Sequence, residues 1–194
     1  GEDHPLYEQV NVQGTRRLLE RLRTIGCTQF LFASTLLVHA SGEKGRRITE
    51  DWPLAPAWAY PRSKVRTEGV IERHRGPIKS VVMRFAGVYD EDCRAAFVAQ
   101  QIARIYEKLP TAWLFAGDVS RGQPYLHVDD LVDAVERAVE RRERLPESVV
   151  LLIGEDGTPS YDDLQRRLGA LIHGERWRTI ALPKKFTQFG AWFQ

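Results

Sequence analysis

Short apolar runs alternate with amphipathic helical segments along this chain, and that order constrains the fold more than any other feature. Residues 30–33, 79–84 and 149–153 form strand-like runs, whereas residues 6–23 and 129–141 have helical spacing. Strands separated by helices pair most readily in parallel, with the helices covering the sheet. The sequence therefore predicts an α/β fold with a parallel sheet and helices on both faces.

Helix-end signals support this segmentation. Asp129 and Asp130 precede a long amphipathic run, and we expect them to cap that helix. Ser160, followed by Asp163, is a capping pattern for a later helix that ends near Gly174.

Composition excludes several classes of protein. The chain has 194 residues, 43% of them hydrophobic, and a net charge of +2, which is too small to argue for nucleic-acid binding. No run of eighteen apolar residues occurs, so no membrane span is predicted. Cys27 and Cys93 lie far apart without a C-x-x-C partner, which predicts neither a metal site nor a disulfide. A reducing, cytoplasmic compartment fits best.

Tyr60 and Lys64 are the leading catalytic candidates. They are four residues apart, so on a helix they share one face. A free phenol has a pKa of about 10, and an adjacent ammonium favours its ionised form, which suits acid/base catalysis near neutral pH. The pair alone is weak evidence, because exposed tyrosine and lysine residues at this spacing are common on helices.

Five further segments occur in a fixed order around this pair. They are residues 11–15 (NVQGT), 30–35 (FLFAST), 82–89 (VMRFAGVY), 125–131 (YLHVDDL) and 153–154 (IG). Together they resemble the extended short-chain dehydrogenase/reductase family, the NAD-dependent epimerase/dehydratase group, from about residue 7 to about residue 172. The resemblance implies a partial Rossmann-like sheet. Residues 1–90 would form the C-terminal part of the NAD(P)-binding domain, and residues 91–194 interwoven sheet segments with an incomplete substrate-binding domain.

The same resemblance assigns catalytic roles. Thr35 would hydrogen-bond the substrate carbonyl or alcohol, Tyr60 would give or take the alcohol proton, and Lys64 would hydrogen-bond the nicotinamide ribose. The cofactor would be NAD or NADP, with NAD slightly favoured.

Further cofactor contacts are implied for Ser34, which is either structural or cofactor-facing, and for the segment from Phe85 to Val88. His127 and Asp129 match a family turn in which such residues fix structure, and we assign them no catalysis.

The family's glycine-rich turn, whose backbone N–H groups hold the cofactor pyrophosphate, has no counterpart here, because Gly14 lacks further glycines at the right spacing. We therefore expect the chain to be a fragment that begins within a Rossmann domain and to bind NAD or NADP negligibly by itself. Residues 184–194 read as an amphipathic helix without a stop signal, which suggests a cut at that end as well.

At several positions the sequence differs from the family pattern, and these differences limit the reactions and substrates that we expect. Leu36 and Leu37 follow Thr35 where sugar dehydratases carry an acid pair, so dehydration is not expected. Gly87 and Gln123 stand where nucleotide-sugar epimerases carry diphosphate-binding side chains, with Arg121 a displaced substitute, so we expect a substrate less charged than a nucleotide sugar.

The sequence thus favours an NAD(P)-dependent oxidoreductase or epimerase acting on a secondary alcohol or ketone. A nucleotide-sugar epimerase is the first alternative, and a non-catalytic nucleotide-sensing or assembly subunit the second. The expected partner is a small-molecule substrate, with neither nucleic acid nor membrane, and the resemblance leaves a homodimer open.

Overall fold

The computed structural model describes residues 5–43, 45–175 and 177–183, and the chain divides into two compact units. The first unit comprises Gly1–Ala86 and Leu126–Gly154, and the second Gly87–Tyr125 and Glu155–Gln194. The chain therefore leaves the first unit, returns to it and leaves it again. The helix expected over residues 184–194 lies outside the described residues.

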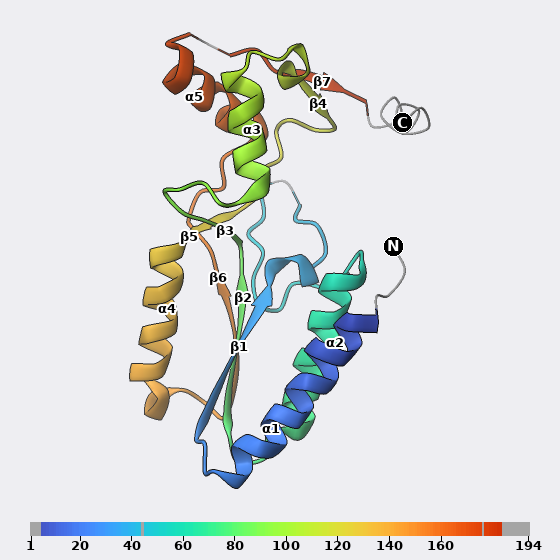
Figure 1. Cartoon of the computed structure of the whole chain (residues 1–194), viewed down its shortest axis with the longest axis vertical. Coiled ribbons are helices and arrows are strands. Elements are labelled where there is room, and N and C mark those ends of the chain that lie inside the picture. The colour runs from blue at the N-terminus through green and yellow to red at the C-terminus, as the bar shows by residue number, and fades with distance from the viewer. Residues whose placement is uncertain (1–4, 44, 176, 184–194) are drawn as a thin grey trace. The chain divides into compact units, whose positions relative to one another are not determined.

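A parallel sheet forms the centre of the first unit (Figure 1). Strand β2 (Lys79–Phe85) lies between β1 (Gln29–Thr35) and β6 (Ser148–Ile153), and both pairings are parallel. Thr35 is in register with Phe85, and Phe85 with Ile153, so the three strands end together at one edge. The predicted parallel sheet is confirmed.

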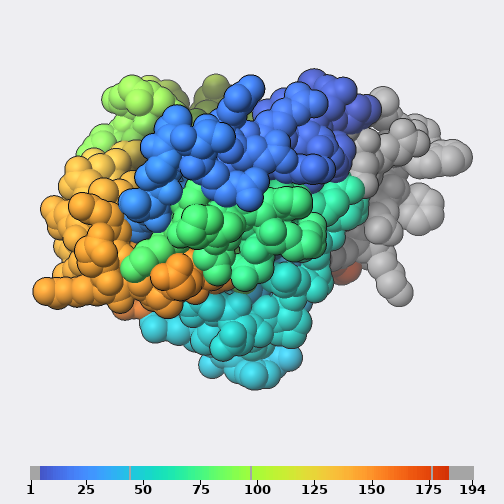
Figure 2. Space-filling model, turned by 90° about the horizontal axis from the view of Figure 1, so that it is seen from below, coloured from blue at the N-terminus to red at the C-terminus, as the bar shows by residue number. Residues whose placement is uncertain are grey.

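Helices cover both faces of this sheet. Helices α1 (Gly14–Thr24) and α2 (Ala59–His74) lie on one face and α4 (Val128–Glu140) on the other (Figure 1). Figure 2 shows α1, in blue, lying along α2, in green.

Successive strand residues point to opposite faces, and the core follows that period. Leu19, Ile71 and Val82 are buried together on the α1/α2 side. On the α4 side, a second cluster is formed by Val81, Met83, Phe85, Ala86, Leu126 and Ala138.

The first helical segment differs from its predicted pattern. Tyr7–Gln13 are π-helical (η1), and the α-helix α1 begins at Gly14. The spacing predicts that Val10, Leu18, Leu19 and Leu22 face inward. Leu19 is fully buried and Val12 is buried, but Val10 and Leu18 are 65% and 47% exposed. The i→i+5 hydrogen bonds of a π-helix place an extra residue in the turn, which shifts the apolar stripe before Gly14 away from its α-helical positions.

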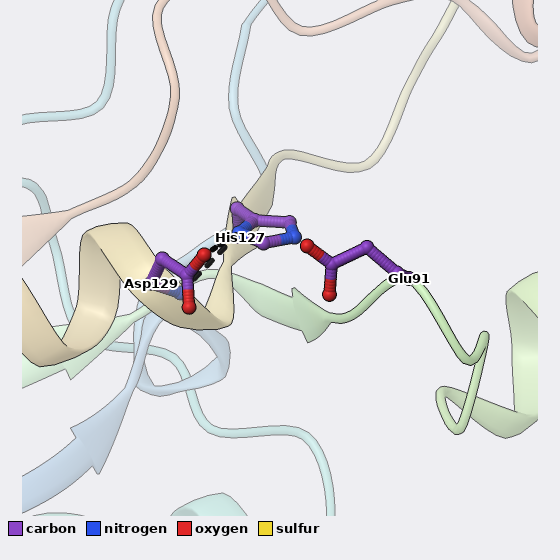
Figure 3. Close-up of side chains that lie close together, drawn as sticks. All are labelled: Glu91, His127 and Asp129. Carbon is purple, nitrogen blue, oxygen red and sulfur yellow. Dashed lines mark hydrogen bonds and ion pairs between the residues drawn. The ribbon is translucent and has the colours of Figure 1, made fainter.

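The cap of α4 is also not the predicted one. His127, the last residue of β5 (Tyr125–His127), is the N-cap, and its Nδ1 accepts a hydrogen bond from the Asp129 backbone N–H at 3.3 Å (Figure 3). Asp129 and Asp130 lie inside the first turn, where carboxylates favour the positive end of the helix dipole. The Asp129 carboxylate is 3.6 Å from the same nitrogen.

The second unit packs α3 (Ala96–Tyr106) against α5 (Tyr161–His173). Ser160 caps α5 through the Asp163 N–H at 3.0 Å, and Gly174, at φ 71°, ends it, as the sequence predicts. A parallel pair of strands, β4 (Leu114–Ala116) and β7 (Ile180–Leu182), completes the unit together with β3 (Gly87–Tyr89). The remaining elements are short 3₁₀ turns at Leu36–Val38 (η2), Pro110–Trp113 (η3) and Arg142–Arg144 (η4).

Ile71 is a test of the α2–sheet contact, because its side chain has no solvent exposure. We expect Ile71→Ala to lower the free energy of unfolding by about 2–5 kcal/mol, through lost apolar burial and the cavity left behind. Urea denaturation measures this. Ile25→Ala, at a position that is 76% exposed, is the matched control, and equal effects of the two changes would contradict the packing described.

Candidate active site

Thr35, Tyr60 and Lys64 lie together at the carboxyl edge of the sheet. The Tyr60 phenol hydrogen-bonds the side chain of Thr35, the last residue of β1. One turn further along α2, the Lys64 Nζ donates to the Ala33 carbonyl at 2.7 Å and lies 5.7 Å from the centre of the Tyr60 ring. The local sequence allows this placement because Pro61 falls in the first turn of α2, where a missing N–H leaves no helix bond unmade.

The protonation of this site differs from the sequence expectation. Burial raises the pKa of Tyr60, and nearby Tyr7 raises it further, while the hydrogen bond from Thr35 opposes the shift. The predicted lowering by Lys64 is therefore wrong for the structure as it stands. The reason is geometric, because the ammonium is directed at the Ala33 carbonyl and the face of Phe32, 4.7 Å from its ring centre.

Burial also lowers the pKa of Lys64, and the carboxylate of Glu68 opposes that shift. The Glu68 carboxylate thus favours the charged form of Lys64.

The predicted cofactor residues have differing surroundings. Ser34 is buried and donates its hydroxyl hydrogen bond to Glu68 of α2. Phe85 packs in the core on the α4 side of the sheet. Val88 lies in the second unit, on β3, and is 37% exposed. Cofactor contacts by these residues stay predictions.

A buried ion pair that sequence reasoning did not find lies beneath this site. Arg84 of β2 binds both carboxylate oxygens of Glu68, with Nε–Oε1 at 3.2 Å and Nη2–Oε2 at 2.7 Å. The two side chains are only 6% and 10% exposed. The signal available in the sequence was Glu68 itself, which follows Lys64 by one helical turn.

The same guanidinium holds the loop that follows β1. Its Nη1 lies 3.1 Å from His39 Nε2 and donates to the Glu50 carbonyl at 3.1 Å. Because arginine has no acceptor, Nε2 of His39 must accept, which leaves the proton on Nδ1 to bind the Trp52 carbonyl at 2.8 Å. These two hydrogen bonds require His39 to be neutral, with its proton on Nδ1.

Glu50 joins the loop to the far edge of the sheet. Its Oε1 accepts a hydrogen bond from the Leu152 backbone N–H of β6 at 3.0 Å, and this bond lowers the pKa of the carboxyl. The loop after β1 is therefore anchored to strands β2 and β6.

Asn11 connects the π-helical segment to the same helix. Its Nδ2 donates to the hydroxyl of fully buried Ser63 at 2.9 Å, and Ser63 donates to the Tyr60 carbonyl at 2.7 Å. The turn that carries Tyr60 is thus held from a second side. Short π-helical segments occur often at functional sites.

A cavity of about 310 Å³ lies within the second unit. The rings of Phe115 and Tyr161 lie against one another in its wall, with centroids 3.7 Å apart. Gln101, which accepts a hydrogen bond from the Tyr161 hydroxyl at 3.0 Å, and Arg121 also line it. An aromatic wall with amide and guanidinium groups suits a planar, partly anionic ligand.

Sequence comparison agrees with this geometry. Residues 2–154 match the NAD dependent epimerase/dehydratase family. The chain belongs to that family. The resemblance inferred from the motifs is confirmed.

The names of the curated relatives give different reactions and substrates. An uncharacterized UDP-glucose epimerase of Bacillus subtilis is 26% identical, over 75% of this chain and 46% of its own length. The decarboxylating sterol-4-alpha-carboxylate 3-dehydrogenase of Saccharomyces cerevisiae is 23% identical, over 83% of this chain and 48% of its own length. The chain thus spans about half the length of these relatives.

Solved structures show the same fold. The UDP-glucuronic acid 4-epimerase of Bacillus cereus, in complex with NAD, has a TM-score of 0.75 at 24% identity, over 95% of this chain and 60% of that chain. The UDP-glucose 4-epimerase of Thermotoga maritima, with UDP-glucose, has a TM-score of 0.70 at 26% identity, over 89% of this chain and 56% of that chain. Across the part of the chain that the structure describes, no helix is both long and apolar enough to cross a membrane.

His39 gives a pH-dependent prediction. Burial lowers its pKa from 6.5, and the positive charge of Arg84 lowers it further, against the opposing bond to Trp52. Between the lowered folded value and 6.5, the unfolded chain binds more protons, so stability is present above pH 6.5 and is lost as the pH falls. We expect a loss of at most about 1.4 kcal/mol per pH unit.

Urea denaturation of the wild type and of His39→Gln between pH 7.5 and pH 5 measures this contribution. The variant should lose less stability on acidification, because its amide does not titrate. His74→Gln, which removes an imidazole from the end of α2 instead of from the loop after β1, is the control. Parallel pH curves for the wild type and His39→Gln would contradict a neutral His39 in the fold.

Proposed function

We propose that this chain carries the catalytic residues of an NAD(P)-dependent oxidoreductase or epimerase that acts on a secondary alcohol or ketone. The observation that carries the proposal is the Tyr60 phenol, hydrogen-bonded to Thr35 at the end of a parallel strand and followed one turn later by Lys64. Open α/β sheets bind their ligands at this carboxyl edge.

The donor groups present fit a nicotinamide ribose. An ammonium has three N–H donors, and the Ala33 carbonyl takes one from Lys64. Donors therefore remain for ribose hydroxyls. NAD or NADP, when bound, supplies or accepts the hydride, and the protein supplies position and charge.

Tyr60 and Thr35 handle the proton. The Tyr60 phenol is protonated near neutral pH, since its pKa is not below that of an ordinary phenol, and it can donate its proton to a carbonyl oxygen. Thr35 shares a hydrogen bond with that phenol and can hold the same substrate oxygen. In the reverse direction Tyr60 acts as the phenolate, which takes the alcohol proton and becomes the phenol.

The residues after Thr35 argue against dehydration. Leu36 and Leu37 form a 3₁₀ turn with Val38, and the Leu37 N–H donates to the Thr35 hydroxyl at 3.3 Å. This turn offers no carboxyl group, and elimination of water needs an additional acid and base.

Tyr60→Phe tests the assignment in the intact protein with a substrate that it turns over. Loss of the phenolic proton should lower kcat by about 10²–10⁴-fold, and Lys64→Ala should lower both kcat and cofactor affinity. Steady-state kinetics and cofactor titration measure these effects. Tyr106→Phe, at a 70% exposed position, is the control, and full activity of Tyr60→Phe would refute the assignment.

A nucleotide-sugar epimerase is the second candidate. Support comes from the aromatic cavity of the second unit, where a nucleoside base could stack on the wall formed by Phe115 and Tyr161 and Arg121 could face a phosphate. The names of the relatives agree, since several are UDP-sugar epimerases. The absence of an arginine at Gln123 still favours a less charged substrate.

Phe115→Ala separates the two candidates. If a nucleoside base stacks on Phe115, KM for UDP- or dTDP-sugars should rise about tenfold or more, because such stacking contributes about 1–3 kcal/mol. Epimerised product, measured by chromatography, and nicotinamide absorbance with uncharged ketones and alcohols provide the two readouts. Turnover confined to nucleotide sugars would establish the second candidate, and turnover confined to uncharged substrates the first.

A further inference from the structure

The Glu68–Arg84 pair joins α2, the helix of Tyr60 and Lys64, to the central strand β2. Three turns of α2 meet consecutive residues of β1, with Tyr60 bound to Thr35, Lys64 to Ala33 and Glu68 to Ser34. The middle strand residue of that set, Ser34, is therefore tied to Glu68, while its neighbours on either side are tied to the catalytic candidates.

Arg84 makes this contact rigid. Its guanidinium is bidentate to Glu68, and the remaining nitrogen, Nη1, is engaged by His39 and the Glu50 carbonyl. A planar, bidentate guanidinium–carboxylate pair fixes direction as well as distance. Since Arg84 is on the central strand, Glu68 is held relative to β1 and β2 at once.

Stability alone does not account for such a pair. Two charges that are only 6% and 10% exposed lose much of their hydration, and buried ion pairs are often no more stabilising than apolar residues of similar volume. A geometric role is consistent with the pair's position one helical turn from Lys64.

We propose that Glu68 and Arg84 are positioning residues, whose ion pair sets where α2 lies along β1 and so places the Tyr60 phenol and the Lys64 ammonium for reaction. This inference rests on the proposed function of the Tyr60 site. Glu68 also opposes the effect of burial on Lys64 and helps to keep it charged.

The paired substitution Glu68→Leu/Arg84→Met tests the proposal in the intact protein, because it removes both buried charges together. We expect kcat to fall about 10²-fold, the effect of a misplacement of roughly 1 Å in a catalytic site. Measured well below its melting temperature, the variant should keep KM for the substrate nearly unchanged. Glu72→Leu, on the next turn of α2 and with a 62% exposed side chain, should keep the wild-type kcat.

Two further measurements keep the proposal falsifiable. If the double variant does not fold, Glu68→Asp carries the test, since it retains the charge but shortens the side chain by one methylene, and kcat should fall about tenfold. A crystal structure of whichever variant folds should show the Lys64 Nζ–Ala33 O contact longer than its present 2.7 Å. Wild-type kcat, or an unchanged contact, overturns the proposal.

Tyr60→Phe, assayed in the same series, separates the two ideas. If Tyr60→Phe loses turnover and the Glu68 variants do not, the positioning role is refuted and the proposed function stands. If Tyr60→Phe keeps turnover, the proposed function fails, and the crystallographic contact alone decides whether Glu68 and Arg84 position α2.

Discussion

Parallel pairing on the central strand β2 is the constraint on which the rest of the first unit depends. With β1, β2 and β6 in one direction and in register, their carboxyl ends coincide at Thr35, Phe85 and Ile153. Side chains alternate between the two faces, so Met83 and Phe85 meet the α4 side, while Arg84 points toward α2. Strand β2, which contributes to the core on both faces, thus also carries the buried Arg84 guanidinium beneath the site.

The Arg84 guanidinium connects three parts of the first unit. Arg84 joins the sheet to α2 through Glu68 and to the loop after β1 through His39. The neutral imidazole and the anionic carboxylate are both required, because a buried guanidinium without partners is strongly unfavourable. Acidification protonates His39, and substitution removes the Glu68 carboxylate. Each perturbation therefore takes one partner from the Arg84 guanidinium.

The second unit contributes a different kind of surface. Its core around Ile105, Ala112 and Trp177 supports α3 and α5, and its cavity is aromatic where the first unit's site is polar. The relatives differ in the substrates that their names give, as a UDP-glucose epimerase and a sterol dehydrogenase show. The fold therefore does not set the substrate, and the side chains of such cavities select it.

The sequence by itself determined the elements that depend on local patterns. Periodic apolar residues predicted the parallel strands and most of the helices, Ser160 and Gly174 marked the ends of α5, and the spacing of Tyr60 and Lys64 placed both on one helical face. These signals are carried by neighbouring residues, and tertiary packing did not alter them.

Only the tertiary structure decided the features that depend on burial and on distant partners. In the π-helical turn Val12 is buried and Val10 is exposed. His127, and not Asp129, is the N-cap of α4. The raised pKa of Tyr60 arises from burial, which the spacing of two residues does not encode. The Glu68–Arg84 pair joins positions 16 residues apart on a helix and a strand, and only their packing across the sheet face brings the two charges together.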